Sequence, residues 1–371
     1  MPAMAGLFYN ASVLKPGEVR VLRTISMPLA FLIVALLALA CQKSEPSPAP
    51  AAPPAPEVRV PGEADLPGAW EADVRQKILR VAAEALRERK PGDPAPVAVF
   101  DFDHTCVRGD FGRAFFDWMI QKDRIRWGEP IYNALPEDKR SDIRQAVEAL
   151  GKLPPEKRAG SREQARLRKL MHKSYWGLCR SENWEQCFPW QVRFYAGYSP
   201  QEITAMAREV WAAELTRPMG SEPIREGPDD EQPAITGTGI RVYAEMRALI
   251  GALSRHGFEV WIVTAGPQWV VRAAGPDLGV PEERVLGMRT AVEGGKLTAT
   301  MDPPPTFRKG KQLAVEKFIG RKPVLAFGDS WSDAEMLAGA RQAVLIDRGY
   351  ADLRKHAQEA GWLVQPEFSV K

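Results

Sequence analysis

Two carboxylates directly follow an apolar segment of strand length near residue 100. Asp101 and Asp103 come after the run from Val97 to Phe100. Such a short apolar run predicts a buried strand, and ligands bind at the carboxyl ends of strands in open α/β sheets. In an ideal strand the two side chains fall on one face, where their negative charges repel each other unless a cation or a shared proton relieves them. The pair therefore predicts a catalytic site with a positive charge close by.

Two later apolar runs also end in polar residues. The run from Phe258 to Val263 leads into Thr264, and the run from Pro323 to Phe327 leads into a stretch that contains Asp329. Because the carboxyl ends of parallel strands meet at one edge of a sheet, we expect these residues to lie near Asp101. A basic, glycine-containing turn that includes Lys311 lies between the two runs and supplies the expected cation.

These motifs occur in a recognisable order. Asp-x-Asp-x-Thr at 101–105, the threonine, the lysine and Gly-Asp-x-x-x-Asp at 328–333 together resemble the haloacid dehalogenase (HAD) superfamily of phosphohydrolases. The long segment after the first motif resembles the phosphoserine-phosphatase-like branch, and residues 260–290 resemble bacterial exported phosphorylcholine phosphatases. The resemblance extends from Pro94 to the end of the chain. It implies a doubly wound, Rossmann-like parallel α/β core with a large, mostly helical cap inserted after the first motif.

The resemblance also implies roles for the two aspartates of the first motif. Asp101 is expected to be the nucleophile that forms an aspartyl-phosphate, and Asp103 the acid that protonates the leaving oxygen and then activates water. Asp103 must start protonated, and the negative charges of Asp101 and the phosphate raise its pKa. A single Asp-x-Asp after a strand is also typical of a helix-capping loop, but four ordered motifs favour the catalytic interpretation.

A magnesium ion and a phosphate-binding set follow from the same resemblance. Asp101, Asp329 and the backbone carbonyl of Asp103 are expected to hold Mg²⁺, which prefers hard oxygen ligands. The hydroxyl of Thr264 and the backbone N–H of Ala265 suit a phosphoryl oxygen.

Further residues of these motifs are expected to support the site. Lys311 neutralises the developing charge, with Lys309 as the rival for that role; Lys311 is favoured because it follows a glycine and begins the apolar periodicity. Asp333 is expected to orient the metal shell or Lys311 rather than bind the metal. Thr105 closes the first motif in a supporting role.

The segment from Phe111 to about Leu215 is the expected cap, which closes over the site and selects the substrate. Its aromatic residues suit a quaternary ammonium group, through cation–π attraction of about 0.5–2 kcal/mol per ring, or they form the core of the cap. Asp110 either reads a substrate amine or caps the helix that begins at Phe111. The aromatic residues are Trp118, Trp127, Tyr132, Tyr175, Trp176, Trp184, Trp190, Tyr195, Tyr198 and Trp211.

The first residues of the chain predict export. Residues 1–41 have the charged, apolar and small-residue regions of a secretory signal, and they resemble a lipoprotein signal that ends at a lipidated Cys41. A plain signal peptide or an uncleaved anchor is the alternative. Residues 42–62 are rich in proline and alanine and predict a tether. We therefore expect a lipid-anchored protein that faces the periplasm or the exterior.

Composition limits the remaining possibilities. The formal net charge of +3 gives no reason to expect a nucleic-acid partner. Cys179 and Cys187 are close enough in sequence to pair in an oxidising compartment, or to remain free. Residues 63–110 and 238–371 are assigned to the catalytic core, and residues 111–237 to the cap and a polar hinge. Helices are expected over residues 69–89 and 239–256, from their periodicity and their position.

These patterns predict a magnesium-dependent phosphomonoester hydrolase. The expected substrate is a small amine-bearing phosphate, phosphocholine or phosphoethanolamine. A broad-specificity acid phosphatase or a phosphoserine phosphatase is the alternative. A phospho-ligand-binding lipoprotein without turnover is disfavoured, because a binding module needs no acid/base carboxylate beside a nucleophile.

Overall fold

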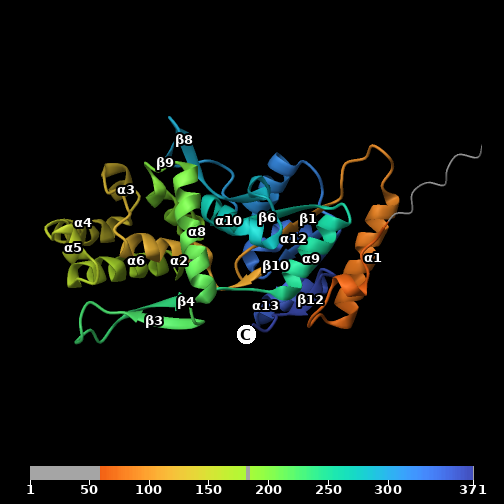
Figure 1. Cartoon of the computed structure of the whole chain (residues 1–371), viewed down its shortest axis with the longest axis horizontal. Helices are drawn as coiled ribbons and strands as arrows, with labels where there is room; N and C mark the ends of the chain where they lie inside the picture. The colour runs from red at the N-terminus through yellow and green to blue at the C-terminus, as the bar shows by residue number, and fades with distance from the viewer. Residues whose placement is uncertain (1–58, 181–183, 371) are drawn as a thin grey trace, which may run out of the picture. The chain divides into compact units, whose positions relative to one another are not determined.

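A six-stranded parallel sheet runs in the order β12-β11-β10-β1-β6-β7 through the catalytic core. The computed structural model describes residues 59–180 and 184–370 (Figure 1). The chain enters the sheet at β1, adds β6 and β7 on one side, and then returns to add β10, β11 and β12 on the other. The strands are β1 Val97–Phe100, β6 Glu259–Pro267, β7 Val285–Met288, β10 Leu325–Gly328, β11 Gln342–Asp347 and β12 Leu363–Pro366.

This strand order is that of a doubly wound sheet, whose direction of growth switches between β1 and β10. The residues of β1 are fully buried and alternate between two core clusters, Ala98 and Phe100 in one and Val97 and Val99 in the other. Both faces of the sheet are therefore covered, which explains the continuous apolar runs. The predicted fold class is confirmed.

Helices of the core pack on the sheet and on its connections. The expected helix at 69–89 is α1, and the expected helix at 239–256 is α9, each shorter than its expected range. The core helices are α1 Ala72–Glu88, α9 Ala244–Arg255, α10 Gln268–Ala274, α11 Lys309–Ala314, α12 Ala334–Ala338 and α13 Ala351–Glu359.

The cap occupies the chain between β1 and β6 and is mostly helical, on the side of the molecule opposite α1 (Figure 1). It leaves the core after β2 (Val107–Arg108) and returns at β5 (Arg241–Val242), and these two strands pair antiparallel. The cap helices are α2 Phe111–Gln121, α3 Glu129–Asn133, α4 Glu137–Gly151, α5 Pro155–Arg158, α6 Arg162–Arg180, α7 Trp184–Val192 and α8 Pro200–Thr216.

Two hairpins were not expected from the sequence. The segment expected as a polar hinge, residues 218–239, instead forms the antiparallel pair of β3 (Gly220–Ile224) and β4 (Ala234–Thr238). Burial alternates along β4, where Ala234 and Thr236 are covered, so a two-residue periodicity prevails over the turn-rich composition. The second hairpin joins β8 (Thr290–Glu293) to β9 (Lys296–Met301).

The signal segment, Cys41 and residues 42–58 of the expected tether lie outside the described residues. None of the helices in the described part of the chain combines the length and apolarity that a bilayer-spanning segment needs.

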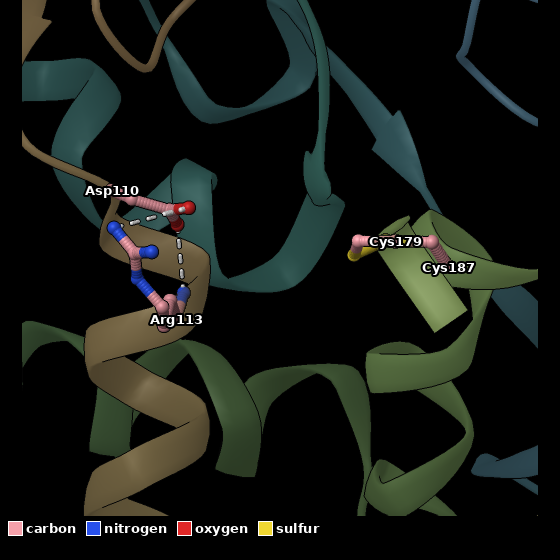
Figure 2. Close-up of a disulfide and its surroundings, with 4 residues drawn as sticks. All are labelled: Asp110, Arg113, Cys179 and Cys187. Carbon is pink, nitrogen blue, oxygen red and sulfur yellow. Dashed lines mark hydrogen bonds and ion pairs between the residues drawn. A yellow bond between two sulfur atoms is a disulfide. The ribbon is translucent and has the colours of Figure 1, made fainter. Parts of the chain in front are cut away.

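A disulfide joins α6 to α7. Cys179 and Cys187 are linked with their Cα atoms 5.0 Å apart, so of the two possibilities open from the sequence the structure has the paired one (Figure 2). We expect the double variant Cys179→Ser/Cys187→Ser to lose about 2–3 kcal/mol of unfolding free energy, because the cross-link restricts the unfolded chain over a short loop. Urea unfolding of both proteins measures this. A reductant should destabilise only the parent protein; equal stability of the two oxidised proteins would contradict the prediction.

Candidate active site

Three neighbouring strands deliver the predicted residues to one edge of the sheet. Asp101 follows β1, Asp329 follows β10, and Thr264 lies in the last part of β6. The backbone N–H of Asp101 donates to the carbonyl of Phe327 at 2.9 Å, which extends the β1–β10 pairing into the site. The structure therefore brings the ends of the first, second and fourth motifs together at the switch point of the sheet.

Lys311 is the cation that the paired carboxylates require. Its Nζ atom is fully buried and lies 2.5 Å from an oxygen of Asp101 and 2.5 Å from an oxygen of Asp333. Burial is the largest single effect on the pKa of Lys311 and lowers it, but the charges and hydrogen bonds of the two carboxylates together outweigh burial, so the pKa is raised above its ordinary value. Lys309, the rival, is exposed to solvent.

The start of α11 brings Lys311 into this position by a close backbone approach. A Cβ atom at Gly310 would lie 1.7 Å from the carbonyl oxygen of Pro305, so only glycine fits there. The glycine thus allows the turn before the helix to fold tightly, which directs the following lysine inward.

Thr105 and Asp333 hold the carboxylates in place. The Thr105 hydroxyl lies 3.1 Å from Asp101 and 3.2 Å from Asp329, and its single proton can serve either one. One oxygen of Asp333 accepts hydrogen bonds from the backbone N–H groups of Asp329 and Ser330, and the other faces Lys311. Asp333 is therefore placed to orient the β10 loop and the lysine.

Asp103 is half-buried, and its carboxylate accepts a hydrogen bond from the backbone N–H of Phe111 at 2.8 Å. Burial, followed by the negative charge of Asp110, raises the pKa of Asp103 well above its ordinary range. A raised pKa favours the protonated form of the carboxyl group, which is the form a general acid needs.

Thr264 and Ala265 are the predicted phosphate-binding residues on β6. The Thr264 oxygen accepts a hydrogen bond from the backbone N–H of Gly266 at 2.9 Å, so its hydroxyl hydrogen can be donated to another acceptor. Both residues line the same cavity as Asp101 and Asp103. Their placement suits the binding of a phosphoryl oxygen.

Arg348 belongs to the site and was not found from the sequence. It directly follows β11, and its guanidinium donates to Asp329 at 2.8 Å. Arg348 is not part of a motif with a defined spacing. Its position directly after a strand of the parallel sheet is the sequence feature that could have identified it. Burial, and then the charges of Asp101 and Asp333, raise the pKa of Asp329 well above its ordinary value.

A cavity of about 690 Å³ opens above these residues, between the core and the cap. Of the aromatic residues predicted in the cap, only Tyr175 lines it among the described side chains; the side chain of Trp184 is not described. Tyr132, Trp190, Tyr195, Tyr198 and Trp211 are buried and contribute to the core, with Trp118, Trp127 and Trp176 packed against it. The other rings at the cavity are Phe188, Phe307, Trp331 and Tyr350.

Asp110 has both placements that the sequence left open. Its carboxylate caps α2 by accepting from the backbone N–H of Arg113 at 2.8 Å, and it also lines the cavity. Figure 2 shows Asp110 paired with Arg113 at the start of α2. Capping uses one of its oxygens and the other lies 3.8 Å from the Arg113 guanidinium, so a cationic group in the cavity would share this carboxylate with Arg113.

The acidic side chains of the site fit a divalent cation. One carboxylate oxygen from each of Asp101, Asp329 and Asp333 lies within 4.8 Å of the others, and all three residues are buried. With Asp103, these carboxylates outnumber the two cations that contact them, Lys311 and Arg348. Asp101 and Asp329 line the cavity and Asp333 does not, so Asp101 and Asp329 are the better side-chain ligands.

Residues 191–338 match the sequence profile described as haloacid dehalogenase-like hydrolase. The chain contains a haloacid dehalogenase-like hydrolase domain. It is also 25% identical to the phosphorylcholine phosphatase of Pseudomonas aeruginosa over 272 residues, which cover 65% of this chain and 70% of the relative. The predicted HAD-type phosphatase is confirmed by these two findings. The first motif, at Asp101, precedes the matched range.

The chain was also compared with solved structures. A functionally unknown protein from Anaerococcus prevotii has a TM-score of 0.65 at 22% identity, covering 80% of this chain and 92% of its own. This likeness supports the fold. A substrate-bound phosphoserine phosphatase complex has a TM-score of 0.38 at 14% identity, covering 74% and 95% of the two chains.

Proposed function

We propose that this HAD-type phosphatase hydrolyses small amine-bearing phosphomonoesters, phosphocholine or phosphoethanolamine, with the help of magnesium. The observation that carries the proposal is the pairing of Asp101 with buried Lys311 beneath a cavity that also contains Asp110. The phosphorylcholine phosphatase relative supports the choice of substrate.

The reaction uses two carboxylates in different protonation states. An oxygen of Asp101 attacks phosphorus while the bond to the leaving oxygen breaks, and protonated Asp103 gives its proton to that oxygen. Asp103 then takes a proton from water, which attacks the aspartyl-phosphate and releases phosphate from Asp101. Lys311, Thr264 and the Ala265 N–H stabilise negative charge on the phosphoryl oxygens.

Asp101, Asp329 and the Asp103 carbonyl would hold the magnesium ion. When bound, it supplies positive charge to the phosphoryl group and to the acidic side chains. Lys311, held by Asp333, keeps Asp101 oriented toward the cavity.

The cavity wall toward the cap suits an ammonium group. Asp110 supplies a negative charge, and Tyr175 and Phe188 supply aromatic faces. Each well-placed ring adds roughly 0.5–2 kcal/mol of cation–π attraction.

Phosphate release tests this proposal. The protein is assayed with magnesium on phosphocholine, phosphoethanolamine, phosphoserine, a nucleotide and an aryl phosphate. A preference of about a hundredfold in kcat/KM for the first two, ~2.7 kcal/mol, supports an ammonium-reading cavity. Equal rates on all substrates indicate the broad-specificity alternative, and a lead for phosphoserine indicates a phosphoserine phosphatase. No turnover indicates a binding protein.

Magnesium activation should depend on pH. Burial raises the pKa of Asp101 to about 6, so its proton competes with the cation below that pH. Because the pKa of Asp101 is raised, the protonated form of its carboxyl group gains population as pH falls toward and below 6, and magnesium activation should weaken in that direction. We expect the magnesium concentration for half-maximal rate to rise about tenfold for each pH unit below 6. Titrations at pH 5, 6 and 7.5 measure it; a constant value over this range would contradict the role of Asp101 as a ligand.

We also propose export and lipid anchoring at Cys41. The support is the sequence pattern of residues 1–41. Fractionation of cells that express the full chain tests it: Cys41→Ser should move the protein from the membrane fraction to the soluble fraction.

A further inference from the structure

A second cavity, of about 570 Å³, adjoins the catalytic one. The two share His104, Asp110 and Arg348 in their walls. His104 is part of the first motif and has a left-handed backbone, with φ 63°. The second cavity lies where the cap joins the core, because β2, β5 and the hairpin β3–β4 all contribute to it.

Four arginines from four separate segments line this second cavity. Arg108 comes from β2, Arg113 from α2, Arg241 from β5, and Arg348 from the loop after β11. The cap, its two connecting strands and the core thus each place a guanidinium group around this cavity, although the residues are up to more than two hundred positions apart in the sequence.

Arg108, which is exposed to solvent, lies opposite Arg241 in the β2–β5 pairing. They are partners in the antiparallel β2–β5 register, an arrangement that is destabilising for like charges. Arg241 donates to the carbonyl oxygens of Leu215 at 2.9 Å and Ile240 at 2.8 Å, which carry no charge. Within the described part of the chain, neither arginine has a carboxylate partner within ion-pair distance.

The carboxylates around this cavity already have other partners. Glu214 accepts from Arg217 and from the backbone N–H of Gly239, and Glu367 accepts from the Tyr243 hydroxyl at 2.6 Å. Asp110 caps α2 and lies 3.8 Å from the guanidinium of Arg113, and Arg348 is paired with Asp329. Among the described residues, Arg108 and Arg241 are therefore the arginines of this wall that have no carboxylate within ion-pair distance.

We propose that this arginine-lined cavity binds a doubly charged oxyanion of the phosphate type. Guanidinium groups match such an anion through paired, charge-assisted hydrogen bonds. The anion would relieve the Arg108–Arg241 repulsion and would connect the cap to the core. Two sources share this chemistry: inorganic phosphate released by the catalytic site, or a second anionic group on a substrate. The proposal does not depend on which amine the catalytic cavity prefers.

Calorimetric titration of the metal-free full chain with inorganic phosphate, at low salt and with a chelator, tests the binding. Without metal, the carboxylates of the catalytic site repel phosphate, so binding reports the arginine-lined cavity. We expect Arg108→Gln to weaken binding at least tenfold and Arg108→Lys to weaken it less. Arg87→Gln, an exposed arginine on α1, is the matched control and should bind like the parent.

Steady-state kinetics with magnesium separates the two sources. If released phosphate is the ligand, it should inhibit aryl phosphate hydrolysis with a component that high substrate concentration does not relieve, and Arg108→Gln should remove that component. If a substrate group is the ligand, Arg108→Gln should raise KM at least tenfold for a bisphosphorylated substrate and leave KM for the aryl phosphate unchanged. No phosphate binding to the metal-free parent protein, or equal binding by Arg108→Gln, would overturn the proposal.

Discussion

Replacement of Asp101 by asparagine should abolish turnover while leaving the protein folded. The substitution keeps the shape of the side chain but removes the anionic oxygen that would attack phosphorus and a charge that would hold the metal. Asparagine can still accept a hydrogen bond from Lys311, which now lies 2.5 Å from the Asp101 carboxylate. We expect kcat to fall about 10⁴-fold or more, ~5.5 kcal/mol of transition-state stabilisation. Phosphate release on the preferred substrate measures it.

The matched control is Asp347→Asn. Asp347 is the last residue of β11 and immediately precedes Arg348, but its carboxylate pairs with Arg354 and with the backbone N–H of Gly349 rather than with Lys311 or Arg348. The Asp347→Asn variant carries the same chemical change at the same edge of the sheet. Its kcat should remain within a factor of two of the kcat of the parent protein. Mass spectrometry of the quenched reaction should detect a phosphorylated peptide containing residue 101 in the parent but not in Asp101→Asn. Turnover by Asp101→Asn near the parental rate would rule out Asp101 as the nucleophile.

Replacement of Lys311 by methionine should give the largest loss of stability among the site variants. The lysine is fully buried between Asp101 and Asp333, and methionine leaves two buried carboxylates without a counter-charge. Breaking a buried ion pair by removing one partner costs about 3–5 kcal/mol. Urea unfolding at pH 7 without metal measures this loss, and kcat should fall at least a hundredfold because the charge beside Asp101, the proposed nucleophile, is gone.

The pH dependence of the Lys311→Met defect has a defined sign. A buried carboxylate without a partner has a raised pKa, so it takes up a proton as pH falls and its penalty shrinks. The stability difference from the parent should therefore be smaller at pH 5 than at pH 7. Lys309→Met, an exposed lysine two positions away, should change neither stability nor kcat. A difference in stability that grows toward pH 5 would contradict this electrostatic account.

The residues at the centre of the site could be predicted from the sequence because each polar residue directly follows, or lies at the end of, an apolar run that forms a strand. Apolar runs mark β1, β6 and β10, and the residues after or within their ends, Asp101, Thr264 and Asp329, converge because parallel strands share an edge. Lys311 was preferred over Lys309 from the position of its glycine and of the apolar periodicity. The structure buries Lys311 and exposes Lys309.

Other features depend on tertiary contacts that no local pattern reports. Arg348 has no motif of its own and reaches Asp329 only because β11 pairs with β10. The hairpin β3–β4 lies in a segment whose prolines and glycines predict irregular structure. It forms strands because Ile224 and Ala234 are paired and buried.

The aromatic residues of the cap show a second feature that the sequence alone does not predict, namely which rings line the cavity. Their number was visible in the sequence, but whether a ring faces a core or a cavity depends on which helix covers it. Most of them pack together, as Trp190 does against Phe116 and Phe194. Phe307 and Trp331, from core loops, line the catalytic cavity instead. Composition thus showed that aromatic side chains are numerous in the cap, but not which of them line the cavity.

The pairing of β2 with β5 makes the cap a replaceable module. Val107 and Arg108 lie opposite Val242 and Arg241, so the two points at which the cap leaves and re-enters the core are adjacent in space. The core therefore meets an insertion of any length through one short, fixed junction, and longer insertions add little loop-closure entropy. Evolution or a protein engineer can exchange the segment between these strands to change which molecules reach Asp101, while the proposed phosphoryl-transfer residues stay as they are.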